Sequence, residues 1–599
     1  MKNFITSMLG AFVALVIFTT AAFLLFIGFI GAIVAMGQQR KVPELAAGSY
    51  IVFDLSSNIT DSPPPVDLGG FSAVRNDVLQ LRSVTRALRY AAHDGKIRGV
   101  LLLGNLTPSL TGSGLAALRE IRAALADFRS SGKPVLAFLD YATTRDFYLA
   151  SAANEVSIDP YGMIVMPGLA SQPIFYAGAF EKYGIGVQVT RVGKFKSYVE
   201  PFTRTDMSPE NREQLQKLLD DLWGSLISDI GRSRGVTTES IQATVDAEGL
   251  IKPAAAVRAH LVDRVAYRDE IIDRLKKETG VTSPTESFKQ IPLSVYAKTA
   301  VRPPVPPGYG QVAVVYAEGD IVDGEGDSTE VGGARFAREI RRLREDSSVR
   351  AIVLRVNSPG GSVTASETIQ RELRLAHKAK PVVVSMGSYA ASGGYWISAY
   401  GDRIFAEPTT ITGSIGVFGI QFNLQKLANE HGFTFDSVKT GKYADSITIA
   451  RPMTEDELAV LQRRVDWIYS QFVAKVAEGR RLKPDFVEEI AQGRVWSGAE
   501  AKKLGLVDEI GSLSDAVKYA GAQAHLGQSF RVTEFPQSKT LSEALAEMLG
   551  KYAPATLHLQ SSGFAGQIVD QLEALFSRLR ALNDPQGIYA RMPMDIAVR

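Results

Sequence analysis

The residues RAIVLRVN (350–357) repeat, in register, an earlier run of the chain, RGVLLLGN (98–105). Each run is short and largely apolar, which is typical of a strand buried on both faces of a parallel sheet. Further strand-like runs, SYIVFDL (49–55), KPVLAFLD (133–140) and KPVVVSMG (380–387), alternate with amphipathic helical patterns. This alternation predicts βαβ units, and therefore an α/β fold built on parallel sheet.

The two matching runs belong to a longer internal duplication. Residues 141–197 align without a gap with residues 389–445, and the few identities fall mainly on turn residues. Each copy then continues into an amphipathic helical pattern and closes on Leu-Val-Asp, at 261–263 and at 506–508. A proline-rich stretch, VRPPVPPGYG (301–310), separates the copies and favours a domain boundary. The sequence therefore predicts a tandem-duplicated α/β fold.

The N-terminus is the one compositional extreme of the chain. Ile5 to Gly37 contains no charged residue and is rich in Leu, Ile, Val, Phe and Ala. The apolar part of a cleaved signal peptide has about 7–15 residues, whereas a helix that spans a bilayer needs about 20. We therefore predict a transmembrane anchor. Lys2 precedes this span and Arg40 and Lys41 follow it, so flanking charge does not decide its orientation.

These observations divide the 599 residues into four predicted parts. They are an N-terminal transmembrane anchor at 1–40, a first repeat at 41–300, a second repeat at 301–540 and a C-terminal helical tail at 541–599.

Composition excludes several classes of function. The net charge is +2, from 66 basic and 64 acidic side chains, which gives no field that would favour nucleic acid as a partner. The chain has no cysteine, so it can form no disulfide, thiolate–metal site or thiol nucleophile. The 6 histidines are scattered and never form a His-x-x-x-His pair, which argues against a metal hydrolase. We expect neither a metal nor a cofactor.

The two copies differ first at NSPGGS (357–362), which lies between a predicted strand and a predicted helix. Paired glycines let the backbone turn so that amide groups point outward, which suits a developing oxyanion or a phosphate. The first copy has Thr107, Pro108 and Ser109 at the corresponding positions. Taken alone, the glycine pair fits an ordinary strand-to-helix turn equally well.

A second difference lies in YAASGGYW (389–396), again between a strand and a helix. A serine flanked by small residues at such a turn, here Ser392, can expose its Oγ while the next amide, of Gly393, joins an oxyanion hole. The first copy carries Thr144 and Arg145 instead, and an arginine there would obstruct a substrate carbonyl. By itself, Ser392 is also compatible with tight helix–sheet packing.

A serine nucleophile needs a base, and no histidine lies between His377 and His431. A lysine kept neutral by burial is the alternative. In GKFKS (193–197), Lys196 aligns with Ala444 of the second copy, so Lys196 is peculiar to the half that lacks the serine. Most isolated lysines are solvated surface charges, so this hypothesis depends on the asymmetry.

Lys194 has a counterpart in Lys442 and is therefore not distinctive. Ser414, in TGSIG (412–416), aligns with Met166. Its hydroxyl could accept a hydrogen bond from the lysine and orient it, or could simply cap a turn.

These motifs resemble the long-form bacterial signal peptide peptidase A family, also called protease IV. The matching stretches are RVGKFKSYVEPFTRTDMSPENRE (191–213), VNSPGGSV (356–363), SYAASGGYWIS (388–398), TTITGSIGVFG (409–419), GRVWSGAEAKKLGLVD (493–508) and LNDPQGIYA (582–590). The resemblance implies a Clp/crotonase-like fold and a serine peptidase with a Ser-Lys dyad. By motif, Ser392 would be the nucleophile, Lys196 the base and Ser414 its orienting hydroxyl, with the amides of Gly361 and Gly393 as the oxyanion hole.

The family resemblance also implies a place and a substrate. The chain would be anchored by a single pass in the bacterial inner membrane, with its catalytic body on the periplasmic side. It would form a bowl-shaped homo-oligomer, a tetramer, and degrade released signal peptides and other apolar peptides. Two alternatives remain at this point, a crotonase-like acyl-CoA enzyme and a catalytically silent membrane scaffold. Whether the dyad forms within one chain or between chains is open as well.

Overall fold

The computed structural model describes Phe18 and residues 45–64, 66–67, 78–103, 114–299, 310–527, 530–537, 539–540, 582–585 and 587–592. The predicted anchor lies outside these residues, apart from Phe18. Among the helices that can be described, none is long and apolar enough to cross a membrane.

The first half is built on a 7-stranded sheet that is parallel except at β9. Its strands follow the order β10-β7-β6-β5-β1-β11, with β9 paired to β7. They are β1 (Ser49–Asp54), β5 (Ile97–Leu103), β6 (Val135–Thr143), β7 (Glu155–Val165), β9 (Leu250–Ile251), β10 (Arg264–Val265) and β11 (Gln290–Pro292).

The second half repeats this plan in an 8-stranded sheet with the order β21-β19-β17-β15-β12-β23, to which β18 and β22 add. Two short strands, β18 and β19, take the place of the long β7. The strands are β12 (Gln311–Glu318), β15 (Val349–Ser358), β17 (Val382–Ala391), β18 (Arg403–Ala406), β19 (Ile411–Gly413), β21 (Val495–Ser497), β22 (Glu509–Ile510) and β23 (Arg531–Phe535). The predicted tandem duplication of a parallel α/β unit is therefore confirmed.

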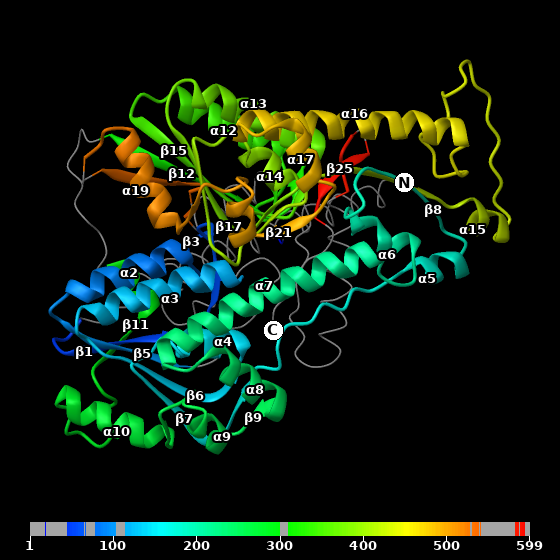
Figure 1. Ribbon diagram of the computed structural model, residues 1–599. Helices are drawn as coiled ribbons and strands as arrows, with labels where there is room; N and C mark the ends of the chain where they lie inside the picture. The colour runs from blue at the N-terminus through cyan, green and yellow to red at the C-terminus, as the bar shows by residue number, and fades with distance from the viewer. Residues whose placement is uncertain are drawn as a thin grey trace, which may run out of the picture.

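Helices flank both sheets, and the two halves lie one above the other (Figure 1). In the first half they are α2 (Leu81–His93), α3 (Leu115–Ser130), α4 (Thr144–Ala150), α5 (Ala177–Lys182), α6 (Glu200–Thr203), α7 (Pro209–Arg234), α8 (Thr238–Glu248), α9 (Pro253–Arg258), α10 (Arg268–Thr279) and α11 (Leu293–Thr299). In the second half they are α12 (Gly333–Glu345), α13 (Val363–His377), α14 (Gly393–Ser398), α15 (Gln425–Glu430), α16 (Glu455–Arg480), α17 (Pro484–Ile490), α18 (Gly498–Lys503) and α19 (Leu513–Gln523).

The long helices α7 and α16 correspond to the amphipathic patterns that close the duplication. The apolar positions of α7 that the pattern singles out are buried, from Leu215 to Leu226. In α16 only the later positions are buried, including Val465 and Phe472, while Leu458 and Leu461 are half-buried. The first turns of α16 extend beyond the body of its half, which explains this difference (Figure 1).

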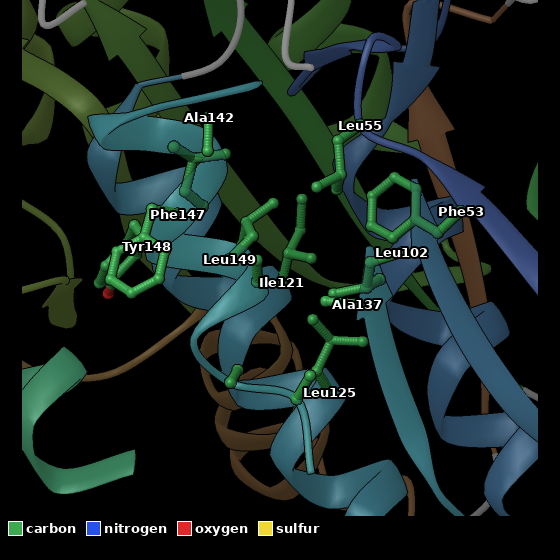
Figure 2. Close-up of a cluster of buried hydrophobic side chains, with 14 of the residues drawn as sticks. Phe53, Leu55, Leu102, Ile121, Leu125, Ala137, Ala142, Phe147, Tyr148 and Leu149 are labelled. Carbon is green, nitrogen blue, oxygen red and sulfur yellow. The ribbon is translucent and has the colours of Figure 1, made fainter. Parts of the chain in front are cut away.

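The core of the first half lies between its sheet and the helices α3 and α4 (Figure 2). Phe53, Leu102, Ile121 and Phe147 are fully buried there, and each such side chain contributes about 1.5–3 kcal/mol of transfer free energy. The same cluster includes residues of the second half, among them Ala391, next to Ser392. The two halves therefore share packed core and are not independent domains joined by a hinge.

A third, 6-stranded sheet joins elements from the whole chain, in the order β14-β13-β16-β25-β20-β8. From the first half comes β8 (Gly186–Arg191), which pairs antiparallel with β20 along its full length. From the second half come β13 (Ile321–Val322), β14 (Val331–Gly332), β16 (Gly360–Ser362) and β20 (Phe418–Asn423), and from the C-terminus comes β25 (Ile588–Arg591).

The described end of the predicted helical tail is thus a strand. Its side chains alternate between two environments, with Ile588 and Ala590 in the core of the second half and Tyr589 in an aromatic cluster beside it. A period of two residues is the pattern of a strand held between neighbours, so pairing rather than helix propensity determines the structure here. Two further pairs of short strands complete the fold, β2 (Asn58–Thr60) with β4 (Val78–Gln80) and β3 (Val66–Asp67) with β24 (Lys539–Thr540).

Buried charges also connect the halves. Arg355 of β15 is fully buried and forms ion pairs with Asp61 at 2.7 Å and with Glu120 at 2.8 Å, both from the first half. Glu120 also accepts a hydrogen bond from the amide of Leu513, at the start of α19. Removing one member of such a buried pair typically costs about 3–5 kcal/mol, so these contacts fix how the halves meet.

Candidate active site

Ser392 lies at the turn between β17 and α14, in the second half. Its backbone has φ 56° and ψ −111°, in a region that residues other than glycine rarely adopt. The amide of Ser392 donates to the carbonyl of Gly413 at 2.8 Å, which holds the turn in this conformation. Strained backbone of this kind gathers at functional sites, where the surrounding structure fixes a reactive side chain.

Lys196 approaches Ser392 from the first half, in the loop that follows β8. Its Nζ lies 2.7 Å from Ser392 Oγ and 3.1 Å from both the Oγ and the carbonyl oxygen of Ser414. The structure thus brings together the three side chains that the sequence comparison singled out. Ser392 and Lys196 belong to the same chain.

The dyad is secluded from solvent, since Ser392, Lys196 and Ser414 are each 0% exposed. Burial lowers the pKa of Lys196 well below the ordinary lysine value of 10.5, because the charged form loses its hydration. Among the residues that the structure describes, no carboxylate contributes to this shift of the Lys196 pKa. The environment therefore favours the neutral amine.

Two glycines allow the lysine loop to approach the second half closely. Gly193 has φ 99° and Gly493 has φ 77°, both in the left-handed region. A Cβ at Gly493 would lie 2.6 Å from the amide nitrogen of Lys196, and one at Gly193 would collide with the backbone of Gln492. The amide of Phe195 then donates to the carbonyl of Gln492 at 2.9 Å. A side chain at either glycine would displace Lys196.

The first turns of α7 hold the same loop from the other side. Gln214 donates to the carbonyl of Phe195 at 2.9 Å and to Ser197 Oγ at 3.0 Å. Ser197 donates in turn to Asn211 at 2.8 Å. Sequence analysis missed Asn211 and Gln214 as positioning residues, because polar residues at the start of a helix also occur as ordinary caps. Their full burial distinguishes them here.

The glycine pair of the second half lies beside the nucleophile turn. Gly360 has φ 103° and Gly361 has φ 154°, so the two positions favour glycine. A Cβ at Gly360 would lie 2.7 Å from the amide nitrogen of Gly393, which makes Gly360 the immediate neighbour of that amide. Gly361, the residue expected from the sequence, lies one position further and pairs with β13 and β25.

In the described part of the chain, no group of three or more His, Asp or Glu side chains is arranged to hold a metal ion. Among the described residues, Ser392 Oγ forms hydrogen bonds with the Lys196 amine and, at 3.5 Å, with the carbonyl of Gly416. The arrangement is thus a hydroxyl beside a buried amine, which is the requirement for a serine nucleophile activated by a lysine base.

Comparison with known proteins agrees with this geometry. The family model "Peptidase family S49" matches residues 127–282 and 374–527, one segment in each half, and the model "Clp protease" matches residues 318–412. "Protease 4" of Salmonella typhi is 34% identical over 588 residues, which are 95% of this chain and 93% of the relative. "Protease 4" of Haemophilus influenzae is 31% identical over 612 residues, 94% of this chain and 95% of the relative.

"Serine protease SPPA, chloroplastic" of Arabidopsis thaliana is 32% identical over 554 residues, 91% of this chain and 77% of the relative. Among solved structures, a ClpP1 mutant from Listeria monocytogenes aligns with 34% of this chain and 94% of its own, at 18% identity and a TM-score of 0.23. The relatives favour proteolysis over acyl-CoA chemistry or a silent scaffold. The chain belongs to peptidase family S49 and is a serine protease with a duplicated, Clp-protease-like α/β fold.

Proposed function

We propose that the chain hydrolyses apolar peptides, released signal peptides among them, as a membrane-anchored serine endopeptidase with a Ser392–Lys196 dyad. The observation that carries this proposal is the 2.7 Å contact between Ser392 Oγ and the Nζ of a fully buried Lys196. A neutral amine has one lone pair and two N–H groups. The lone pair of Lys196 can therefore accept the Ser392 proton, while its N–H groups donate to Ser414.

The reaction would be acyl transfer. Lys196 removes the proton of Ser392, and Ser392 Oγ attacks the peptide carbonyl. The resulting oxyanion is bound by backbone amides, those of Gly393 and of the glycine pair, for which the sequence favours Gly361 and the proximity to Gly393 favours Gly360. The protonated Lys196 then gives its proton to the leaving amine. Water, activated again by Lys196, hydrolyses the acyl-enzyme.

The substrate class is supported by the apolar surroundings of Lys196. Tyr198, two residues after Lys196, belongs to a buried cluster of aromatic and aliphatic side chains with Phe202, Phe418 and Ile420. Apolar surroundings of this kind favour extended apolar peptides over charged ones. The uncharged stretch from Ile5 to Gly37 supports a single N-terminal membrane anchor. We place the catalytic body outside the cytoplasm, on the periplasmic side of the inner membrane.

The internal duplication supports a homo-oligomer, for which we propose a tetramer. The segment of the first half that contains β8 and Lys196 packs against the second half, but its counterpart in the second half, residues 433–449, is largely exposed. That segment presents large apolar side chains, among them Phe433, Val438 and Ile447. Exposed apolar surface of this kind marks an interaction site. A second copy of the chain would cover this apolar surface if neighbouring chains packed against each other as the two halves do.

A fluorophosphonate probe tests the proposal directly. We expect Ser392 to be labelled and a leucine-rich peptide to be hydrolysed, and both signals to disappear in Ser392→Ala. A lysine-rich peptide of equal length is the substrate control and should be hydrolysed more slowly. Turnover of an acyl-CoA in place of peptide would favour the crotonase-like alternative. Neither labelling nor turnover in the unmodified chain would favour a silent scaffold.

A further inference from the structure

The motif GRVWSG (493–498) belongs to a stretch that resembles the peptidase family, yet the proposed mechanism assigns it no role. With Gln492 before it, this motif forms most of a segment, residues 492–497, that we call the strap. The strap ends in β21, which pairs antiparallel with β19. It contacts both the loop that carries Lys196 and the turn that carries Ser414, so it connects the proposed base with its orienting hydroxyl.

Backbone hydrogen bonds join the strap to both neighbours. The amide of Phe195, next to Lys196, donates to the carbonyl of Gln492 at 2.9 Å. The amide of Ser414 donates to the carbonyl of Arg494 at 2.7 Å. Ser414 has φ 50°, in the left-handed region that a serine rarely adopts, so this bond helps to hold a strained turn. Two carbonyls of the strap therefore fix the lysine loop and the Ser414 turn relative to each other.

The side chain of Arg494 lies over two aromatic rings, one from each half. Its guanidinium carbon is 4.7 Å from the ring centroid of Phe195 in the lysine loop and 4.7 Å from that of Trp496 in β21. Cation–π attraction and planar stacking favour arginine over lysine at such a position. Phe195 is buried and the side chain of Arg494 is 20% exposed. The stack thus attaches the strap to the residue directly before Lys196.

Helix α7, which lies against β21 (Figure 1), supports the same contacts from the first half. Arg494 forms an ion pair with Glu213 at 3.1 Å. The side-chain oxygen of Gln214 accepts from the amide of Val495 at 3.3 Å, while its side-chain nitrogen donates to the carbonyl of Phe195. Because Glu213 is largely exposed, the ion pair contributes little, and the ring contacts are the main attachment of Arg494.

We infer that Arg494 is a positioning residue of the protease, which sets where Lys196 lies relative to Ser392 by holding the lysine loop and the Ser414 turn on one segment. The inference rests on the proposed function of the dyad, and it adds a residue that acts through Lys196 without touching the reacting atoms. Among the described residues, no charged group contributes to the shift of the Lys196 pKa, so the effect of Arg494 is one of position.

The test measures kcat, KM and the pH profile of peptide hydrolysis by full-length Arg494→Met. We expect kcat to fall by roughly 10- to 100-fold with KM nearly unchanged, because a small displacement of a catalytic group is costly while the substrate contacts remain. The midpoint of kcat/KM against pH should move to higher pH, because water that reaches the loosened Lys196 raises its pKa toward the ordinary value. A merely structural arginine would lower the melting temperature without moving this midpoint.

Arg374→Met is the matched control. Arg374, in the last turn of α13, lies 4.4 Å from the ring centroid of Tyr400 and pairs with Glu478 at 3.3 Å, so its removal breaks the same two kinds of contact. This variant should leave kcat and the midpoint unchanged. Arg494→Lys keeps the charge without the planar guanidinium, and it should change both in the same direction but less. It carries the test if Arg494→Met does not fold.

A double-variant cycle with Phe195→Leu checks that Arg494 acts through the lysine loop. Since the two side chains share one contact, the two substitutions together should lower kcat by clearly less than the product of their single effects. Independent effects in this cycle, or an unmoved midpoint in Arg494→Met, would overturn the inference and leave the proposed function intact. If the unmodified chain neither hydrolyses the peptide nor reacts with a fluorophosphonate at Ser392, the inference and the proposed function both fail.

Discussion

The two halves share one fold but differ at the turn where the third strand meets the next short helix. In the second half this turn holds Ser392 and Gly393, and the lack of a side chain at Gly393 lets its backbone lie close to Gly360, since a Cβ there would be 3.1 Å from Gly360 Cα. In the first half the same turn holds Thr144 and Arg145, and the guanidinium of Arg145 is buried, with no hydrogen-bond partner for its Nε and one Nη among the described residues. The first half thus has a buried arginine where the second half has glycine.

The loops after β8 and after α15 differ in the opposite sense, because here the first half carries the candidate site residue. Lys196 is fully buried beside Ser392, while its counterpart Ala444 is exposed, and Lys442 nearby forms an ion pair with Asp456 at the surface. Each half thus keeps one component of the site. The comparison teaches that the proposed site needs both halves, because its proposed base and its proposed nucleophile come from different copies.

Substitution of Lys196 should have the largest effect on turnover. We expect Lys196→Ala to lower turnover by about 10⁴-fold or more, as Ser392→Ala does, because neither residue acts without the other. Lys194→Ala and Lys442→Ala are matched controls in the two halves, and both should remain active because these side chains are exposed. The double variant Ser392→Ala with Lys196→Ala should be scarcely worse than either single one.

Mixing the two inactive single variants sharpens the same comparison. Since Lys196 and Ser392 of one chain are 2.7 Å apart, each inactive chain lacks one component of its own site. Co-assembly should therefore restore no activity. Recovered turnover in the mixture would show that the dyad is completed across chains, and near-normal turnover of Lys196→Ala alone would remove this residue from the mechanism.

The pH dependence of turnover should report the burial of Lys196. Only the neutral amine acts as a base, and burial lowers the pKa of Lys196 well below 10.5. kcat/KM should therefore rise as pH increases through this lowered pKa, about tenfold per unit below it, and level off above it. Lys194→Ala should give the same profile. A profile that is flat from mildly acidic to alkaline pH would contradict a lysine base.

Ser414 should contribute less than the dyad, because its carbonyl remains available to Lys196 when the hydroxyl is removed. We expect Ser414→Ala to lower kcat by about 10- to 100-fold and to shift the midpoint of the pH profile. The counterpart variant Met166→Ser, in the first half, should leave both unchanged. A purely structural Ser414 would lower stability without moving the midpoint.

The smallest effect on turnover is expected at the turn of the first half that holds Thr144 and Arg145. The double variant Thr144→Ala with Arg145→Met should have normal turnover and an equal or higher melting temperature, because it removes buried Arg145 donors that have no partner among the described residues. Peptide hydrolysis and thermal unfolding measure the two outcomes. A large loss of turnover would mean that the first half retains a function of its own.

Comparison of the two copies was sufficient to predict candidate site residues at positions where the aligned halves carry different residues. Lys196 and Ser392 were predicted because each is missing from the other half. The structure places Lys196 Nζ 2.7 Å from Ser392 Oγ. The support for the lysine loop could not be predicted, since Asn211 and Gln214 differ from ordinary helix caps only by their burial. The neighbour of Gly393 could not be chosen either, because Gly360 and Gly361 differ in backbone angle and not in residue type.

The strand β25 escaped sequence analysis for a different reason. Four residues near the end of a chain carry too little pattern to predict a strand, and their partners lie more than 160 residues earlier in sequence. Pairing of this kind depends on the completed fold, so no local propensity indicates it.

Lys196 precedes Ser392 by 196 residues, so the ribosome synthesises the proposed base well before the proposed nucleophile. A ribosome that adds about 5–20 residues per second needs roughly 10–40 s to pass from one to the other. During that interval the nascent chain has a base without a nucleophile. Because the proposed dyad is incomplete during that interval, we expect the partly synthesised protein to cleave neither its own unfolded segments nor those of its neighbours.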